Sequence, residues 1–204
     1  MKETIRYYFL NNLKQYIVVS IVFLIGIILG VIAINNTNED HTDEIKNYIN
    51  TSVSNIKEDN IKNKNMIFFE KIRQKVVIII LCGVLGSTVI GLPLLYIFIG
   101  YRGFSLGYTI SAIIASLETK NALLFSFSGL FAQNIFYILA LFVVTVSGTN
   151  FCRYLLRNES REQIKFEIIK HIVFITISLV IIIVSAFSES YISLNLLKKL
   201  KNYL

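Results

Sequence analysis

Charged side chains are scarce in this sequence, at 16% of its 204 residues, whereas hydrophobic residues make up 54%. A soluble domain usually carries about a quarter charged residues and has no need for so much apolar surface. Apolar runs of about 18 residues or more, the length that a membrane-crossing helix requires, recur along the chain. The composition therefore indicates an integral membrane protein and argues against a soluble one.

Cysteine, histidine and tryptophan are also rare, with two, two and none. Cys82 and Cys152 have no CxxC partner and no neighbouring histidine, so the sequence predicts neither a disulfide framework nor a zinc site. His41 and His171 are far apart in the chain, which leaves a metal centre or a histidine-based catalytic centre poorly supplied. We therefore expect no metal and no cofactor.

Acidic residues are fewer than basic ones, 13 against 20, which gives a net charge of +7. Such a balance also occurs in proteins that bind nucleic acid. Basic residues that flank membrane spans and contact anionic headgroups explain it better here. We therefore expect membrane lipid as a partner and no nucleic acid.

The apolar runs predict an all-α, polytopic membrane bundle of about five transmembrane helices, at residues 16–34, 76–99, 103–117, 122–147 and 171–187. The first run is longer than the core of a cleaved signal peptide, and no A-x-A pattern follows it, so it should remain as a membrane anchor. The other segments are the N-terminus, a polar segment, a basic loop and a tail, at 1–15, 35–75, 148–170 and 188–204. Basic residues on the two sides do not decide the orientation.

The polar segment 35–75 contains an amphipathic pattern. Apolar residues recur there at intervals of four, four and three, which predicts a helix with one apolar stripe, formed by Ile45, Ile49, Val53 and Ile56. The segment is too short to bury a core of its own. The stripe must therefore lie on the membrane, on the rest of the protein or on a partner, and its four residues are candidate partner-binding residues.

The stretch from Gly91 to Tyr108 holds the only proline, Pro93, within an apolar region about twice as long as one span. We expect the chain to reverse here in a tight turn at Gly100–Gly103, with Arg102 among the lipid headgroups. Pro93 would then kink the helix before the turn, close to Gly91.

Small residues form two GxxxG patterns, Gly26 with Gly30 and Gly103 with Gly107. In lipid, close backbone approach at small residues drives helix association, because no hydrophobic force acts between helices. These residues either hold the bundle together internally or form a homodimer face. Ser105 between the second pair also fits G-x-S-x-G, but no histidine and acid accompany it as a hydrolase requires, so a packing role is expected.

Gln133 and Asn134 lie at the centre of the predicted fourth span. An amide pair in hydrocarbon needs hydrogen-bond partners and usually faces the bundle interior. It serves either as a structural interhelical contact or as part of a substrate or ion path. The span from 122 to 147 contains no ionisable residue, which favours the structural alternative.

The order of these features resembles the stage II sporulation protein M family. A signal anchor is followed by a polar segment, a hydrophobic pair joined through "GLP…RGFSLGYT", a span with "QN", and a basic segment before the last span. The resemblance is most specific at Gly91, Leu92, Pro93, Gly103, Phe104, Gly107, Gln133 and Asn134. Ala132 stands where the family commonly has proline. This sequence therefore departs from the family pattern at the position that would kink the fourth span.

The resemblance implies a protein of the mother-cell membrane at the sporulation septum, with a cytoplasmic N-terminus and an extracytoplasmic segment 35–75. It implies a non-enzymatic scaffold that localises peptidoglycan-remodelling proteins during forespore engulfment, with stage II sporulation proteins D and P as partners. The alternative is a channel or transporter that uses the helices broken by glycine and proline. The scarcity of ionisable residues in the predicted spans argues against it.

Overall fold

The computed structural model describes residues 10–36, 64–116, 132–157 and 161–193, and every regular element within these ranges is helical. The elements are α2 (Leu13–Asn35), α4 (Lys64–Gly86), α5 (Gly91–Ser116), α7 (Ala132–Leu156), α8 (Arg161–Phe187) and the π-helical segment η2 (Ser188–Ser193). Helices α2, α5, α7 and α8 are long and apolar enough to cross a membrane. The expectation of an all-α membrane bundle is confirmed.

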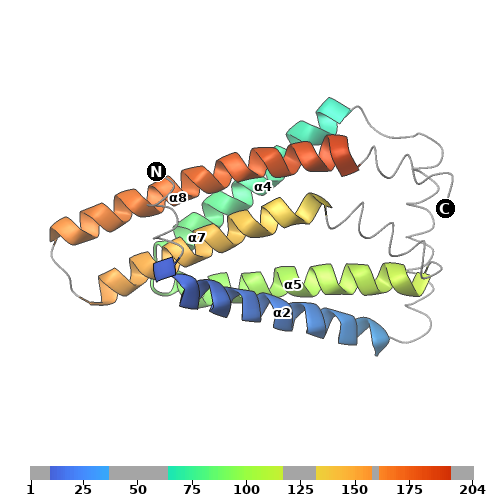
Figure 1. Ribbon diagram of the computed structural model, residues 1–204, viewed down its shortest axis with the longest axis horizontal. Coiled ribbons are helices and arrows are strands. Elements are labelled where there is room, and N and C mark those ends of the chain that lie inside the picture. The colour runs from blue at the N-terminus through green and yellow to red at the C-terminus, as the bar shows by residue number, and fades with distance from the viewer. Residues whose placement is uncertain (1–9, 37–63, 117–131, 158–160, 194–204) are drawn as a thin grey trace.

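The five long helices α2, α4, α5, α7 and α8 lie roughly along one axis (Figure 1). Helix α2 packs mainly on α5, α7 packs mainly on α8, and α4 contacts both α7 and α8. Helices α2, α5 and α8 run in one direction, and α4 and α7 run in the other. The start of α2, the connection from α4 to α5 and the facing ends of α7 and α8 therefore share one end of the bundle, which we call the N-terminal end.

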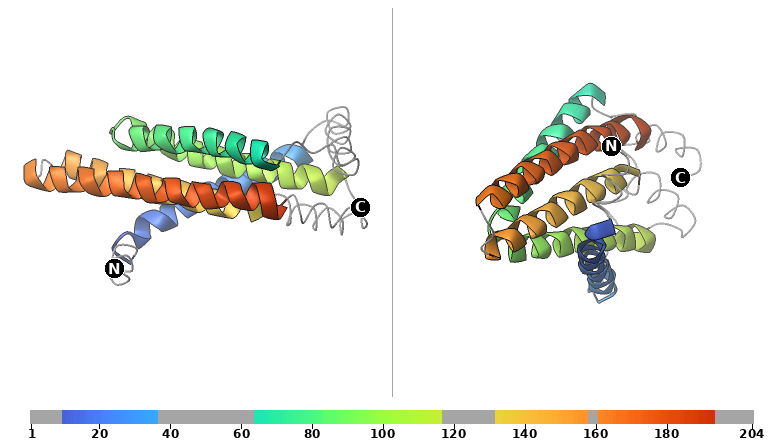
Figure 2. Two further views of the ribbon diagram at one scale, coloured as in Figure 1. Left: turned by 90° about the horizontal axis from the view of Figure 1, so that it is seen from above. Right: turned by 60° about the vertical axis from the view of Figure 1, so that its left-hand side comes forward.

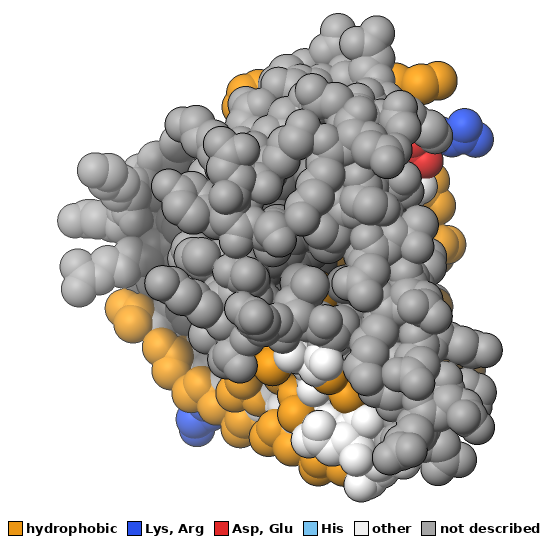
Figure 3. Space-filling view, turned by 90° about the vertical axis from the view of Figure 1, so that its right-hand side faces the viewer, with side chains coloured by type: hydrophobic (Ala, Val, Ile, Leu, Met, Phe, Trp, Pro, Cys, Tyr) orange, Lys and Arg blue, Asp and Glu red, His pale blue; other side chains and the backbone are white. Residues whose placement is uncertain are grey.

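At the N-terminal end, α7 and α8 reach beyond the turn between α4 and α5 (Figure 2). The outer faces of the helices are apolar: side chains such as Ile28, Ile97 and Val180 are more than half exposed. From the opposite end, hydrophobic side chains line much of the visible rim of the described helices (Figure 3). A surface of this kind suits a lipid environment, in which exposed apolar side chains carry no penalty.

The reversal between the second and third helices lies at residues 87–90, not at Gly100–Gly103. The predicted spans 76–99 and 103–117 are therefore wrong. Thr88 Oγ1 accepts a hydrogen bond of 3.0 Å from the backbone N–H of Gly91, which satisfies a donor in the first turn of α5. Pro93 lies in that first turn, where its missing N–H removes no helical hydrogen bond, so it begins a helix instead of kinking one.

Helix α5 continues without interruption through Gly100, Arg102 and Gly103. A helix keeps its backbone hydrogen bonds within itself, so in lipid it does not end merely because glycine lowers its propensity. Gly91 has a different role. A Cβ placed there would overlap the carbonyl group of Leu85, so the close turn between α4 and α5 requires glycine at this position.

Other predicted boundaries also move. Helix α2 agrees closely with the predicted span 16–34, but α4 begins at Lys64, inside the segment that the sequence assigned to 35–75. The basic loop 148–170 is wrong, because α7 runs to Leu156 and α8 begins at Arg161. The tail at 188 begins as η2. Residues 37–63 and 117–131 lie outside the described ranges, which leaves the stripe Ile45, Ile49, Val53 and Ile56 and the start of the fourth span as predictions.

Candidate functional site

Helices α2 and α5 pack as a parallel pair through their glycines. A Cβ placed on Gly26 would overlap the carbonyl oxygen of Gly100, and one placed on Gly30 would lie 2.7 Å from the backbone N of Tyr108. Residue numbers increase together along this contact, as they must in a parallel pair. Both residues of the first GxxxG pattern therefore face α5 of the same chain.

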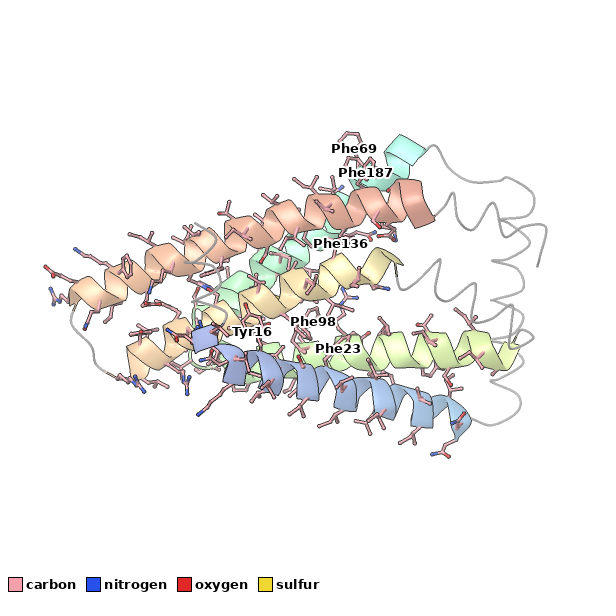
Figure 4. All side chains as sticks on the ribbon, in the orientation of Figure 1. Tyr16, Phe23, Phe69, Phe98, Phe136 and Phe187 are labelled. Atoms are coloured by element: carbon pink, nitrogen blue, oxygen red, sulfur yellow. The ribbon has the colours of Figure 1, made fainter. Side chains whose placement is uncertain are left out.

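The second pattern faces α2 in return. A Cβ on Gly103 would overlap the carbonyl oxygen of Phe23 and lie 3.1 Å from its carbonyl carbon, and one on Gly107 would lie 2.9 Å from the carbonyl carbon of Ile27. The rings of Phe23 and Phe98 lie on the side of this pair that faces α7, where Phe23 meets Phe142 edge-on at 5.6 Å between ring centroids (Figure 4). The two GxxxG patterns thus form one interface within the chain. Of the two alternatives, internal packing and a homodimer face, the structure shows internal packing.

A second close backbone contact joins α4 to α7. A Cβ on Gly148 would lie 2.7 Å from the Cα of Gly86, and a Cβ on Gly86 would lie 3.1 Å from the Cα of Gly148. Cys152 donates a hydrogen bond of 3.3 Å from Sγ to the carbonyl oxygen of Gly86 at the same place. This contact holds the N-terminal half of the bundle together.

His171, on α8, lies in the same half of the bundle and contacts both α4 and α7. It is 4% exposed, and its two ring nitrogens lie 2.9 Å from Ser147 Oγ and 3.1 Å from the carbonyl oxygen of Gly83. A carbonyl can only accept, so Nε2 carries the proton and donates to α4, while Nδ1 faces the hydroxyl on α7. The ring also stacks on Phe151, with an interplanar angle of 7°. One histidine therefore joins three helices, α4, α7 and α8.

Polar side chains also join α2 to α7 near the N-terminal end. Gln15 Nε2 donates to Asn150 Oδ1 at 2.6 Å, and Asn150 Nδ2 donates to Asn12 Oδ1 at 2.8 Å. Tyr96 on α5 shares a hydrogen bond of 3.2 Å with Thr149. Such contacts contribute about 0.6–2 kcal/mol each in membrane bundles.

Helix α5 carries an arginine in the interior of the bundle. Arg102 Nη2 donates to the hydroxyl of Tyr137 on α7 at 2.7 Å. Its guanidinium also lies over two aromatic rings, 4.9 Å from the centroid of Tyr137 and 5.4 Å from that of Phe98. Cation–π contacts of this kind contribute about 2 kcal/mol or more when they are desolvated. The sequence placed Arg102 among headgroups, and the structure corrects this to a site within the helix bundle.

Helix α4 adds a second interior cation beside the same tyrosine. Lys75 Nζ lies 5.5 Å from the centroid of the Tyr137 ring and donates to Ser185 Oγ at 2.9 Å. It also pairs with Glu189 at 2.7 Å. Lys75 and Arg102 therefore place two like charges beside one ring, and the two cations repel each other.

Glu189 is shared between two lysines. It lies 3.0 Å from Lys71 Nζ as well as 2.7 Å from Lys75 Nζ. It is on η2, where α8 widens into a π-helix, a local form that is frequent at functional sites. We call Lys71, Lys75, Arg102, Tyr137 and Glu189 the basic cluster, and it draws on α4, α5, α7 and η2.

The basic cluster is the feature that sequence reasoning missed. The expectation that the bundle has almost no ionisable groups was wrong, because α4 carries its lysines into the interior and Arg102 is not in a turn. Gln133 and Asn134 lie in α7, directly after residues 117–131, which are outside the described ranges, so their expected place at the centre of the fourth span stays a prediction.

A bundle whose outer surface is apolar, whose core buries several polar side chains among hydrophobic ones and whose helices alternate in direction defines a multi-pass helical membrane protein. The sequence model of one family, described as Stage II sporulation protein M, matches residues 19–194. The chain therefore belongs to the stage II sporulation protein M family, and this membership implies a role in sporulation. A search of the curated proteins and a search of the solved structures each returned no match.

Proposed function

We propose that the chain is a non-enzymatic scaffold of the mother-cell membrane at the sporulation septum, which localises peptidoglycan-remodelling proteins during engulfment of the forespore. The observation that carries this proposal is the family match, since it covers residues 19–194 and thus all the described helices apart from the start of α2. By resemblance, the partners are stage II sporulation proteins D and P.

The packing of the bundle supports a holding role. Two backbone-to-backbone contacts, at Gly26–Gly100 and Gly86–Gly148, fix α2 on α5 and α4 on α7. His171 then ties α8 to both members of the second pair. An anchor must hold its aqueous segments in fixed positions at the membrane surface, and an interior joined at so many points is suited to that task.

The proposed docking surface is the stripe Ile45, Ile49, Val53 and Ile56 on the segment between α2 and α4. The residues at the two ends of this segment, Asn35 and Lys64, lie at the end of the bundle opposite the N-terminal end (Figure 1). With a cytoplasmic N-terminus the stripe is extracytoplasmic, on the side where peptidoglycan lies. An amphipathic helix of this kind docks through its apolar face into a groove on a partner.

Charged substitutions in the stripe test the docking role. Ile49→Glu and Val53→Glu are expected to abolish co-purification of the wall-remodelling partners from sporulating cells while the protein stays inserted and abundant. Thr51→Glu, on the opposite face of the predicted helix, is the matched control and should keep the partners. Retention of the partners by all three variants would contradict docking through the stripe.

A channel or transporter is the second candidate, and the basic cluster is the observation that favours it. Ionisable residues inside a membrane bundle commonly mark a substrate or ion path. The test is flux across vesicles that contain the purified protein. Transport of small anions that is lost in Arg102→Gln would favour the transporter, and vesicles as tight as protein-free controls would favour the scaffold.

A further inference from the structure

The basic cluster has more positive charge than its neighbours neutralise. Among the described residues, the cluster holds three cations and one carboxylate, that of Glu189, which pairs with Lys71 and Lys75. Arg102 has no ion pair within the described part of the chain. Its Nε is buried and has no hydrogen-bond partner there, although a guanidinium carries five N–H donors in a fixed fork.

The depth of Arg102 makes this imbalance significant. Gly103, the next residue, packs directly on the backbone of Phe23, which lies at the middle of the apolar helix Leu13–Asn35. Arg102 is therefore near the middle of the membrane. A cation at that depth is costly and is normally paired with an anion or with backbone carbonyls.

The exposure of the side chains in the basic cluster decreases from its edge to its interior. The side chain of Lys71 is 37% exposed, whereas those of Lys75 and Glu189 are 12% exposed. Beyond them lie the ring of Tyr137 and the guanidinium of Arg102. An anion that enters beside Lys71 would thus meet Lys75 and then the free Nε–H of Arg102.

We propose that the basic cluster is a binding site for a phosphate group, carried either by a lipid headgroup or by a free anion. Phosphate fits because its oxygens accept the two parallel hydrogen bonds that Nε and a terminal nitrogen of arginine can donate, while lysines add point charges. The π-helical turn that carries Glu189 is a local irregularity that can shift when the lysines exchange the carboxylate for the phosphate as their ion-pair partner. The proposal does not depend on the scaffold role.

The test is the thermal unfolding of the full-length protein in micelles of a maltoside detergent, which has no phosphate group, at constant ionic strength, with sodium phosphate or with phosphatidylglycerol added to the micelles. Unfolding is followed with a thiol-reactive dye, because Cys82 and Cys152 are both buried. We expect a saturable rise in the midpoint. A rise with sodium phosphate identifies a free anion as the ligand, and a rise only with phosphatidylglycerol identifies a lipid headgroup.

Variants locate the effect. Arg102→Gln is expected to weaken the apparent affinity at least tenfold, and Arg102→Lys to restore only part of it, because lysine cannot form the paired hydrogen bonds. If changes at Arg102 prevent folding, Lys71→Gln, at the partly exposed edge of the basic cluster, is the second test variant, and it should also weaken binding. Lys165→Gln, an exposed position on α8, is the control and should bind as the unaltered protein does. The proposal would be overturned if neither probe gave a saturable shift of the midpoint. It would also be overturned if Arg102→Gln and Lys71→Gln each bound the probe as tightly as the unaltered protein does.

Discussion

A single methyl group at Gly103 tests the interface between α2 and α5. In Gly103→Ala the new Cβ would overlap the carbonyl oxygen of Phe23 and lie 3.1 Å from its carbonyl carbon and 3.2 Å from the backbone N of Ile27. These are backbone atoms, which cannot rotate away, so the helices must separate by about 1 Å. A gap of that size loses a quarter to a half of the dispersion energy of each affected contact.

The expected loss of stability follows from two contributions. Overpacking of a close interface costs about 1–3 kcal/mol. Loss of a Cα–H···O contact between the helices adds about 0.5–1 kcal/mol. The free energy of unfolding should therefore fall by about 1.5–4 kcal/mol, which lowers the midpoint by about 3–16 °C for a chain of this length.

Gly100→Ala on the same helix is the matched control. Its Cβ would meet Val22 Cγ1 at 3.6 Å, an ordinary van der Waals contact, and both variants exchange glycine for alanine in a helix. The difference between them therefore isolates packing from helix propensity. Unfolding in mild detergent is followed by the reaction of the buried Cys82 and Cys152 with a thiol dye. Equal midpoints for the two variants would refute the close-packing account.

The remaining predictions concern the rest of the bundle. Gly148→Ala should lower the unfolding midpoint more than Gly83→Ala, because its Cβ meets backbone of α4 at 2.7 Å whereas the other meets the end of a flexible side chain; the reverse order would contradict the contact. His171→Phe should cost about 1–3 kcal/mol through its two lost hydrogen bonds, and an unchanged midpoint would show that they contribute little. In a cysteine-free background and in open membrane fragments accessible from both sides, Ile90→Cys, at a position 83% exposed in the turn, should react with a membrane-impermeant maleimide, and Arg102→Cys should not. Equal reaction of the two variants would support a turn at Arg102.

The sequence predicts the helical class and the first span because both depend on local pattern. A continuous apolar run such as 16–34 forms a spanning helix in lipid, since only a helix pairs all of its backbone groups within one segment. The structure places α2 at Leu13–Asn35. The glycine spacing likewise identifies the packing faces, since Gly26 and Gly103 are single positions at which close approach needs no side chain. The choice between an internal and an intermolecular contact required the fold.

The turn could have been found from a signal that was overlooked. Ser87 and Thr88 precede Pro93 by a few residues, which is the pattern of a helix start, with a hydroxyl to cap it and proline in its first turn. The glycines at 100 and 103 suggested a break more strongly, because in water glycine weakens helices. In lipid the packing requirement outweighs propensity.

The basic cluster could not be predicted from one sequence. Its members come from four elements, and Lys75 and Glu189 each lie at the edge of an apolar run, where charges usually contact headgroups. Only the register of α4 against α5 and α7 brings Lys75 and Arg102 to the same ring of Tyr137. The π-helical turn that directs Glu189 toward the lysines has no signature in the sequence.

The central claim, that this chain localises wall-remodelling proteins, is tested most directly by imaging those proteins in sporulating cells that lack it. A fluorescent fusion of stage II sporulation protein P should spread over the mother-cell membrane in such cells, and should return to the septum when the unaltered chain is restored. Septal localisation of that fusion in cells without the chain would contradict the scaffold account.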